Sequence, residues 1–213
     1  MLRNERKDTN YWGQFATTYD DKLERMMGKG VRQNLFRMLE RESGLGDAVE
    51  FGCGTGYFTR AIAENATHVT ATDLSPDMLE VAKAKLKGHG NVSFQVEDSE
   101  ATSFPSETFD TALMANMLHT VDDPLKALRE CNRVLKKGGT LLIINYTDQG
   151  MGRVERILME FRFAINFRFP PKKNWPVTEE KLRSALEKSG FTIERMDLIK
   201  GKINAFYVRA KKC

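Results

Sequence analysis

Short β-like runs alternate with helical runs through the middle of the chain, and this alternation limits the fold more than any other feature. Helical spacing of apolar residues occupies most of the intervals between the runs. Parallel strands need crossover connections of this kind, with helices packed on the faces of the sheet. The β-like runs span residues 48–51, 68–73, 92–98, 109–115 and 140–146. The pattern therefore predicts an α/β fold built from repeated βαβ units.

Helix signals lie where this fold needs them. Ser75-Pro76 supplies an N-cap and an N1 proline for a helix over 77–87. Two further runs, 191–198 and 203–209, flank the turn sequence IKGK and predict a C-terminal hairpin. The other expected helices cover two stretches within 11–42, then 58–65, 124–134 (stopped by the sequence KKGG) and 178–189. The result is a doubly wound, Rossmann-like seven-stranded sheet, mostly parallel, with one antiparallel C-terminal strand and helices on both faces.

The 213 residues suit a single domain, 1–213, with two additions to the βαβ core. Residues 1–42 form an N-terminal helical cap, and residues 149–176 form an insertion that we expect to lie over the substrate site as a lid. The first ten residues are charged, so we expect no secretory leader. The three cysteines, Cys53, Cys131 and Cys213, form neither a disulfide framework nor a metal-binding spacing, which favours a cytoplasmic protein without a metal.

The net charge of +4 hides an asymmetry along the chain. Residues 151–213 hold 15 Lys and Arg against 7 Asp and Glu, so the rest of the chain is acidic. A basic C-terminal third can attract an anionic substrate, a membrane surface or nucleic acid. A solvated basic face explains the asymmetry equally simply, and we do not expect DNA or RNA as a partner.

Three glycines within five positions follow the first run, in the sequence VEFGCGTGYF. Gly52 and Gly54 let the backbone turn and approach a ligand without Cβ atoms in the way, and Gly56 lets the next helix start close to the strand. Ligands of α/β folds bind at this edge of the sheet. Asp73 ends the next strand, where a carboxylate can accept both hydroxyls of a ribose.

The glycine spacing separates two nucleoside cofactors. A dinucleotide site carries G-x-G-x-x-G, whereas this chain carries G-x-G-x-G. Glu50 lies two positions before the first glycine, where it would repel a pyrophosphate but attract a ligand with an ammonium and a sulfonium. We therefore infer S-adenosylmethionine (SAM), with S-adenosylhomocysteine as the product. An oxidoreductase that binds a dinucleotide remains an alternative only if the glycine spacing does not report the cofactor.

Five sequence stretches, in order, resemble the class I SAM-dependent methyltransferases, and above all the small-molecule branch that includes the quinone-biosynthesis C-methyltransferases. The stretches are VEFGCGTGYFT, ATDLSPDML, VEDSEATSFPSETFD, the segment from MANMLHT to LLIINY, and the closing hairpin. The resemblance covers residues 11–148 closely and 176–210 loosely. It implies transfer of a methyl group from SAM to a small, hydrophobic or aromatic acceptor.

The resemblance also implies how each site residue is used. Glu50 and the turn Gly52–Gly56, with Cys53 inside it, would hold the methionine part, and Asp73 the ribose. Leu74 and Met78 would pack on the adenine, and Asp98 and Ser99 would contact its edge. Asn116 and Met117 would lie under the sulfonium. Tyr19, in the sequence FATTYDD, would close over the methionine end.

Methyl transfer from a sulfonium needs no acid, because the leaving group departs neutral. A base matters only where the acceptor must lose a proton. His119 is the first candidate and Tyr19 the second, although a packing or capping role explains His119 equally well.

The insertion predicts a helix over 153–167 with two apolar stripes. Val154, Ile157, Leu158, Phe161 and Ile165 share one stripe, and Met159, Phe163 and Phe167 share the opposite one. One stripe should pack on the domain, and the other needs a substrate, a second subunit or a membrane surface, reached through 153–169. The competing interpretation is a helix buried on both sides by its own chain.

Two other functions stay open at this point. The chain can be a methyltransferase of RNA or protein that uses its basic third, or a SAM-binding relative that has lost turnover. Neither contradicts the glycine-rich turn.

Overall fold

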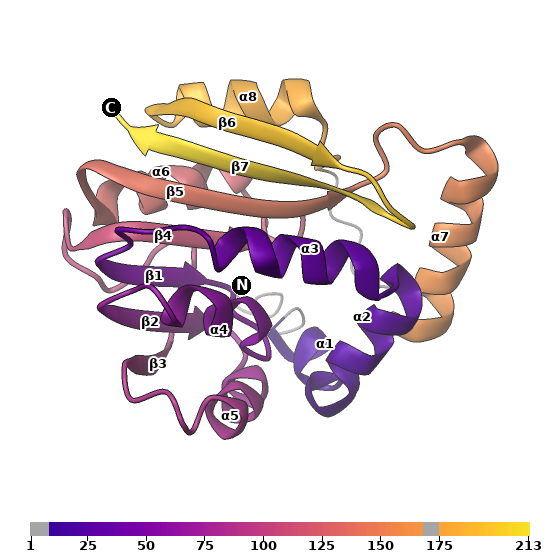
Figure 1. Cartoon of the computed structure of the whole chain (residues 1–213), viewed down its shortest axis with the longest axis horizontal. Coiled ribbons are helices and arrows are strands. Elements are labelled where there is room, and N and C mark those ends of the chain that lie inside the picture. The colour runs from indigo at the N-terminus through magenta and orange to yellow at the C-terminus, as the bar shows by residue number, and fades with distance from the viewer. Residues whose placement is uncertain (1–8, 168–174) are drawn as a thin grey trace, which may run out of the picture.

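Seven strands form one sheet in the computed structural model, which describes residues 9–167 and 175–213 (Figure 1). Their order is β3-β2-β1-β4-β5-β7-β6. Strands β1 to β5 pair in parallel, and β7 is antiparallel to both of its neighbours. The bounds are β1 (Asp47–Phe51), β2 (His68–Asp73), β3 (Val92–Val96), β4 (Phe109–Ala115), β5 (Leu135–Thr147), β6 (Phe191–Ile199) and β7 (Asn204–Lys212). The predicted α/β fold with one antiparallel strand is confirmed.

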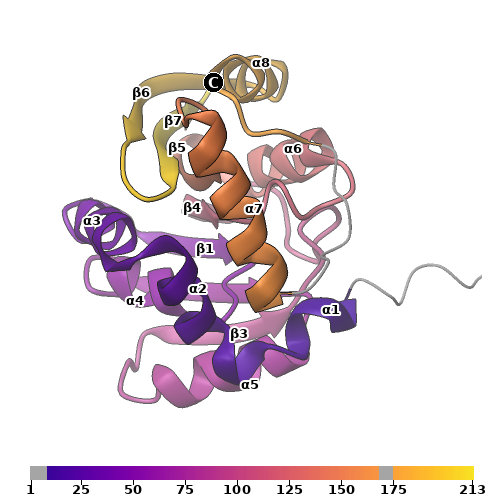
Figure 2. The ribbon, with the colours of Figure 1, turned by 90° about the vertical axis from the view of Figure 1, so that its right-hand side faces the viewer.

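Helices cover both faces of this sheet, as Figure 2 shows with the sheet seen from one end. One face carries α3, α4 and α5, and the other carries α6 and α8. The helices are α1 (Thr9–Gly13), α2 (Tyr19–Met27), α3 (Lys29–Leu39), α4 (Tyr57–Ala63), α5 (Pro76–Lys85), α6 (Pro124–Val134), α7 (Arg153–Phe167) and α8 (Glu179–Lys188), with a 3-10 turn at Ala16–Thr18. Among these helices, none is long and apolar enough to span a bilayer.

Strand β5 shows how the two layers arise from the sequence. Leu141 and Ile143 point into the core on the α6 and α8 side, whereas Leu142 and Ile144 point into the core under α3 and α4. All four side chains are fully buried. A strand buried on both faces is a continuous apolar run, which is why LLII lies in the middle of the sheet.

Local sequence signals set the ends of several helices. The hydroxyl of Ser75 accepts from the Met78 N–H at 3.4 Å and caps α5, and Pro76 follows as predicted. Asp123 caps α6 by accepting from the N–H groups of Leu125 and Lys126. One boundary differs from expectation: the KKGG sequence was predicted to precede the fifth strand, but β5 begins at Leu135, directly after α6. The extra residues are accommodated by a shift in the β4–β5 register between Phe109 and Thr111.

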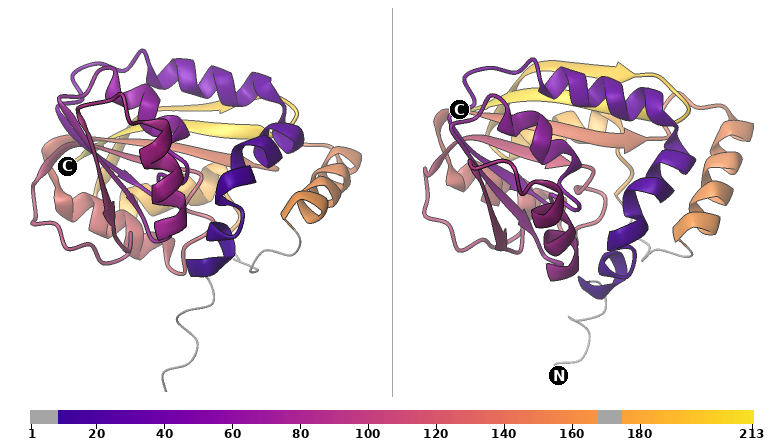
Figure 3. Two further views of the ribbon diagram at one scale, coloured as in Figure 1. Left: turned by 90° about the horizontal axis from the view of Figure 1, so that it is seen from below. Right: turned by 60° about the horizontal axis from the view of Figure 1, so that its bottom comes forward.

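The N-terminal helices and α7 lie at the carboxyl edge of the parallel strands. Figure 3 shows α1 and α2 along this end, with α3 running back from it over the sheet, and Figure 2 shows α7 crossing in front of it. A separate apolar cluster joins them, with Phe15, Leu23 and Met26 against Phe167 of α7. The edge where the glycine-rich turn emerges is therefore bordered by helices from both ends of the chain.

Candidate functional site

The turn between β1 and α4 adopts the left-handed conformations that its glycines permit. Gly56 has a φ of +77°, and a Cβ there would lie 2.8 Å from Cδ1 of Leu86, so α4 can approach α5 only without a side chain. Gly54 has a φ of +54°, and a Cβ there would meet no atom within 4 Å. Gly54 therefore faces open space, which is the side from which a ligand can approach the backbone.

Asp73 fixes this turn to the end of β2. Its Oδ2 accepts from the Gly54 N–H and its Oδ1 from the Ser75 N–H, each at 2.9 Å. Burial raises the pKa of Asp73, and these backbone donors offset part of the rise. The carboxylate that the sequence assigns to a ribose thus also shapes the turn.

A small pocket, partly open to solvent, lies beside the turn. Six residues that the sequence predicts line it: Tyr19, Glu50, Gly52, Cys53, Gly54 and Asn116. It is completed by residues that the sequence analysis did not single out, including Leu23, Arg32, Thr55, Tyr57 and Tyr146.

Glu50 supplies a buried carboxyl group to this pocket. It is 1% exposed, and its Oε2 accepts from the Thr59 hydroxyl at 2.5 Å. Burial raises the pKa of Glu50 to about 8, with the Thr59 hydrogen bond opposing the rise and Asp73 adding to it. A cation beside Glu50 would restore its charge, so the group fits the ammonium of an amino acid.

Arg32 supplies the opposite charge on another wall of the same pocket. Its side chain is 7% exposed, pairs with Asp20 and lies 3.6 Å from the centre of the Tyr57 ring. A buried guanidinium can pair with a carboxylate in a fixed, planar geometry. The lining of this pocket therefore contains one buried carboxyl group and one buried guanidinium, Glu50 and Arg32.

Asp20 connects the N-terminal helices to the turn. Its carboxylate pairs with Arg32 of α3 and Lys85 of α5, and it accepts from the Thr55 hydroxyl at 2.9 Å. Burial alone would raise the pKa of Asp20, but Arg32 and Lys85 outweigh it and hold the pKa below its usual value. One side chain of α2 thus holds three parts of the site in position.

Tyr19 lines the pocket and packs against α7. Its ring lies 5.7 Å from that of Phe167 and 6.0 Å from that of Trp12. Burial raises the pKa of Tyr19 far above its ordinary value, and Arg32 opposes the rise. Tyr19 is therefore a neutral phenol at physiological pH, which favours a hydrogen-bonding role over that of a base.

The end of β4 forms the floor of the pocket. Asn116 has a φ of +57°, unusual for a residue other than glycine, and its side chain accepts from the Tyr146 N–H at 3.0 Å. Met117 is buried, and its Cβ would lie 3.0 Å from a Cβ at Gly52. Met117 thus supports the turn from below, while Asn116 faces the pocket.

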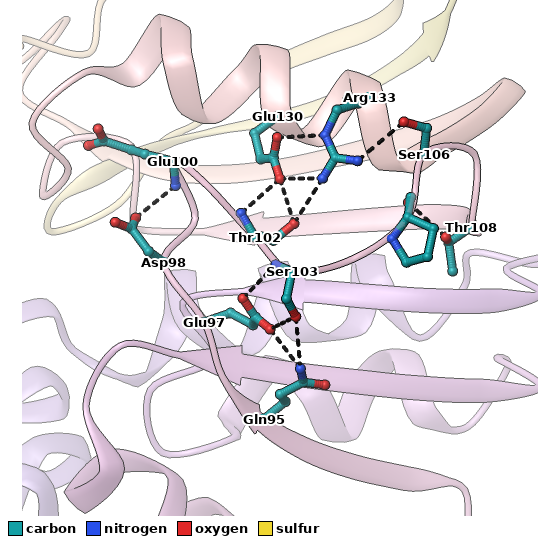
Figure 4. Close-up of polar contacts among 11 residues, drawn as sticks. Gln95, Glu97, Asp98, Glu100, Thr102, Ser103, Ser106, Thr108, Glu130 and Arg133 are labelled. Carbon is teal, nitrogen blue, oxygen red and sulfur yellow. Dashed lines mark hydrogen bonds and ion pairs between the residues drawn. The ribbon is translucent and has the colours of Figure 1, made fainter.

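The residues predicted for adenine lie outside this pocket. Leu74 is 44% exposed, whereas Met78 is almost fully buried by the protein itself. Asp98 is exposed, and its Oδ1 accepts from the Glu100 N–H at 2.8 Å, which leaves the other oxygen available (Figure 4). Ser99 is next to it and half-buried. Leu74 and Asp98 are therefore accessible to a ligand, whereas Met78 is covered by other side chains of the protein.

The loop that carries Asp98 and Ser99 is held by charged side chains on both sides. Ser103 donates its N–H to Glu97 at 2.9 Å, and Thr102 donates its N–H to Glu130 at 2.8 Å (Figure 4). Arg133 pairs with Glu130 and lowers its pKa to about 2. This network fixes the loop after β3 next to α6.

His119 lies behind the pocket wall rather than in its lining. Its Nδ1 is 3.2 Å from Nδ2 and 3.4 Å from Oδ1 of Asn145, which precedes Tyr146 of the pocket. Burial lowers the pKa of His119, and the Asn145 contact opposes this shift. The ring is therefore neutral at pH 7, as a base must be, but it does not line the pocket.

The two stripes of α7 have different surroundings. Met159, Phe163 and Phe167 pack against the cluster that contains Phe15 and Leu23, so this stripe docks on the domain. The opposite stripe, from Val154 to Ile165, is exposed. The interpretation of a helix buried on both sides by its own chain is therefore wrong. The insertion beyond Phe167, up to residue 174, lies outside the described residues.

Arg32, which lines the pocket, and its partner Asp20 are the residues of this candidate site that sequence reasoning missed. Asp20 stands in the singled-out sequence FATTYDD, where only Tyr19 received a role. Arg32 shares a helix face with Leu35, Phe36 and Leu39, and a cation on an apolar face was the signal that could have marked it. Across the described residues, no cluster of His, Cys, Asp and Glu suits a metal ion.

Comparisons with known proteins identify relatives of this chain. Residues 49–143 match the family described as a methyltransferase domain. The ubiquinone/menaquinone biosynthesis C-methyltransferase of Proteus mirabilis is 35% identical over 139 residues, which is 64% of this chain and 52% of that protein. The demethylmenaquinone methyltransferase of Clavibacter sepedonicus is 34% identical over 108 residues, 51% of this chain and 44% of that protein. The chain thus spans about half the length of the curated relatives it matches.

Solved structures share the fold over nearly the whole chain. A SAM-dependent methyltransferase from Thermotoga maritima has a TM-score of 0.75 at 22% identity and covers 96% of this chain and 99% of its own. One from Aquifex aeolicus has a TM-score of 0.69 at 22% identity, with coverage of 94% and 98%. At this identity the likeness concerns the fold.

Proposed function

Because the chain carries a class I SAM-dependent methyltransferase domain, we propose that it transfers a methyl group from SAM to a small, hydrophobic or aromatic acceptor. The observation that carries the proposal is the presence of a buried carboxyl group, Glu50, and a buried guanidinium, Arg32, in the lining of one pocket with Gly54. The relatives named above act on small molecules by their printed names, which supports the acceptor class.

When bound, SAM supplies a methyl group on a sulfonium, which leaves as a neutral thioether. Glu50 would hold the ammonium and Arg32 the carboxylate of its methionine part, which would anchor the end of the chain that leads to the sulfonium. Asp73 takes the ribose hydroxyls, and Leu74, Asp98 and Ser99 border the adenine. Alignment of this kind supplies roughly 7–11 kcal/mol in well-oriented reactions, which is why no catalytic triad is needed.

We infer that the N-terminal helices and α7 close the acceptor side. Tyr19 and Tyr146 bring phenol groups into the pocket, and burial raises the pKa of Tyr146 to about 12. Neutral phenols and aromatic rings suit an uncharged aromatic acceptor. His119 would remove a proton where the acceptor needs it, and otherwise keeps the pocket wall in position.

The proposal is tested in two steps. Calorimetry should show tight binding of S-adenosylhomocysteine and no comparable binding of NADH; the reverse result would reject the proposal. Labelled SAM is then offered with a panel of phenols, quinone precursors, thiols and amines, and the organic extract is counted separately from protein and RNA. Label in the extract supports a small acceptor. Label in the macromolecular fraction supports an RNA or protein methyltransferase, and donor binding without label supports a non-catalytic relative.

A further inference from the structure

Five apolar side chains form an exposed stripe along the outer face of α7, here called the outer stripe. They are Val154 (71% exposed), Ile157 (65%), Leu158 (44%), Phe161 (64%) and Ile165 (65%). Among the described residues, only Leu74 and Val96 are other large apolar side chains of this exposure. Such a concentration on one helix marks an interaction surface rather than scattered exposure.

The outer stripe is not needed to attach α7 to the protein. The opposite stripe already does this, since Phe167 is fully buried and its ring lies 5.5 Å from that of Phe15. Tyr11 adds a hydrogen bond from its hydroxyl to the Phe167 carbonyl. The helix is therefore anchored on one side and presents an apolar surface on the other.

Cations border the outer stripe. On a helix of about 3.6 residues per turn, Arg153 and Arg162 fall on its two sides, and the acidic Glu155 and Glu160 fall behind them, further from its centre. The β6–β7 turn, with the exposed Lys200 and Lys202, reaches the same end of the molecule (Figure 1). Ile203 of that turn packs in the cluster under α7.

We propose that the outer stripe docks α7 on an anionic membrane surface. An apolar helix face bordered by arginines is the pattern of helices that lie in the membrane interface. Negatively charged headgroups complement the arginines and the lysine turn. The cations beside the stripe favour an anionic membrane over a second copy of the chain, whose same face carries the same cations.

The position of α7 gives this docking a consequence that rests on the proposed function. Phe167, on the inner side of the helix, packs against Tyr19, which lines the pocket. A membrane on the outer side would thus lie one helix away from the acceptor site. A hydrophobic acceptor dissolved in lipid could reach the pocket without crossing water.

The test is co-sedimentation of the full chain with vesicles of phosphatidylcholine alone or of equal parts phosphatidylcholine and phosphatidylglycerol. We expect binding to the anionic vesicles that weakens with salt. The Ile157→Ser/Phe161→Ser variant should bind at least about tenfold more weakly, because it loses two buried apolar side chains. Arg153→Gln/Arg162→Gln should lose about thirtyfold. The matched controls, Val96→Ser and Lys137→Gln, change an exposed apolar residue and an exposed cation elsewhere and should bind normally.

Three results would overturn the docking proposal. They are no binding to anionic vesicles, equal binding by the outer-stripe variants, and a dimer in sedimentation equilibrium that Ile157→Ser/Phe161→Ser dissociates. Calorimetry with S-adenosylhomocysteine on the same proteins keeps the two proposals apart. A chain that binds vesicles but not this ligand leaves the docking in place and removes the proposed function; the opposite result removes only the docking.

Discussion

The backbone N–H of Gly54 donates a hydrogen bond of 2.9 Å to Oδ2 of Asp73. The same carboxylate accepts from Ser75 at the start of α5, so one side chain holds the turn after β1 and the turn after β2. Parallel neighbouring strands bring these two turns to one edge. The shape of the pocket therefore depends on a contact between residues 19 positions apart.

Asp73→Ala should weaken both the fold and the ligand site. Two backbone donors lose their acceptor, at a cost of about 1–3 kcal/mol each if they stay buried. We expect a lower melting temperature and at least about tenfold weaker binding of S-adenosylhomocysteine, or 1.4 kcal/mol. Asp73→Asn keeps one carbonyl acceptor, so its melting temperature and affinity should lie between those of the wild type and Asp73→Ala. Unchanged affinity in the alanine variant would contradict the role given to Asp73.

Ligand binding should release a proton from Glu50. Its pKa of about 8 means that the free carboxyl group is largely protonated at pH 7, whereas an ammonium beside it favours the carboxylate. Affinity for S-adenosylhomocysteine should therefore fall as the pH decreases below 8, by up to about tenfold per pH unit. Calorimetry in buffers of different protonation enthalpy measures the released proton. Glu50→Gln should bind S-adenosylhomocysteine more weakly, with an affinity that does not depend on pH. Binding to the wild type without release of a proton would contradict this prediction.

The same carboxyl group should make the fold less stable at alkaline pH. A folded-state pKa raised above the unfolded value gives stability that is complete below the unfolded pKa and is lost as the pH rises through 8. Glu50→Gln cannot ionise and can still accept from Thr59. At pH 9 it should gain at least about 1 kcal/mol over the wild type, or roughly 2–4 °C in melting temperature. The gain should vanish near pH 4, and a constant difference at all pH values would contradict it.

Arg32 should distinguish ligands by their carboxylate. Arg32→Lys keeps a positive charge but loses the planar guanidinium over Tyr57. We expect about tenfold to hundredfold weaker binding of S-adenosylhomocysteine, a loss of roughly 1.5–3 kcal/mol for one charged hydrogen bond. Binding of 5′-methylthioadenosine, which lacks the amino-acid end, should not change and controls for the fold. An equal loss for both ligands would show that Arg32 acts only through the structure of the pocket.

His119→Gln separates a base from a packing residue. As a base, His119 contributes roughly 10²–10⁴ to kcat, and the variant should lose this factor while S-adenosylhomocysteine binds normally. Burial lowers the pKa of His119 below its usual 6.5, so the acidic limb of the wild-type profile should lie below pH 6.5 and disappear in the variant. Full kcat in His119→Gln would assign the ring to packing against Asn145.

Phe167→Ala tests how α7 is anchored. The side chain is fully buried among Trp12, Phe15 and Tyr19, so its removal should cost about 3–5 kcal/mol. Phe161→Ala, on the exposed side of the same helix, should change stability by no more than about 0.5 kcal/mol. Chemical denaturation of both variants measures the contrast. Equal small effects would mean that the inner stripe does not hold the helix.

Sequence reasoning predicted the sheet and most of its helices because the signals there are local. Ser75-Pro76 caps α5, and the alternation of strands and helices leaves few other topologies. The antiparallel hairpin also followed from its turn. The start of β5 at Leu135 did not, because KKGG resembles a turn. Leu135 pairs with Phe109 of β4, and residues 136–139 lie in an irregularity of the ladder before regular pairing resumes at Thr140.

The site was predicted in part, for a related reason. Glu50 and the glycine turn are adjacent in sequence, whereas Arg32 and Asp20 meet them only through packing of the N-terminal helices. Both stripes of α7 are apolar, so periodicity could not tell which one docks. That choice depends on the shape of the surface formed by Phe15 and Leu23.

The triple attachment of Asp20 sets a lower limit on how far this protein can be shortened. A fragment that starts at β1 would retain every strand of the sheet and still lose the carboxylate that joins α3, α5 and Thr55. Such a fragment would be a scaffold with a disassembled pocket. Residues before the first strand are therefore as much a part of the candidate site as the glycines themselves.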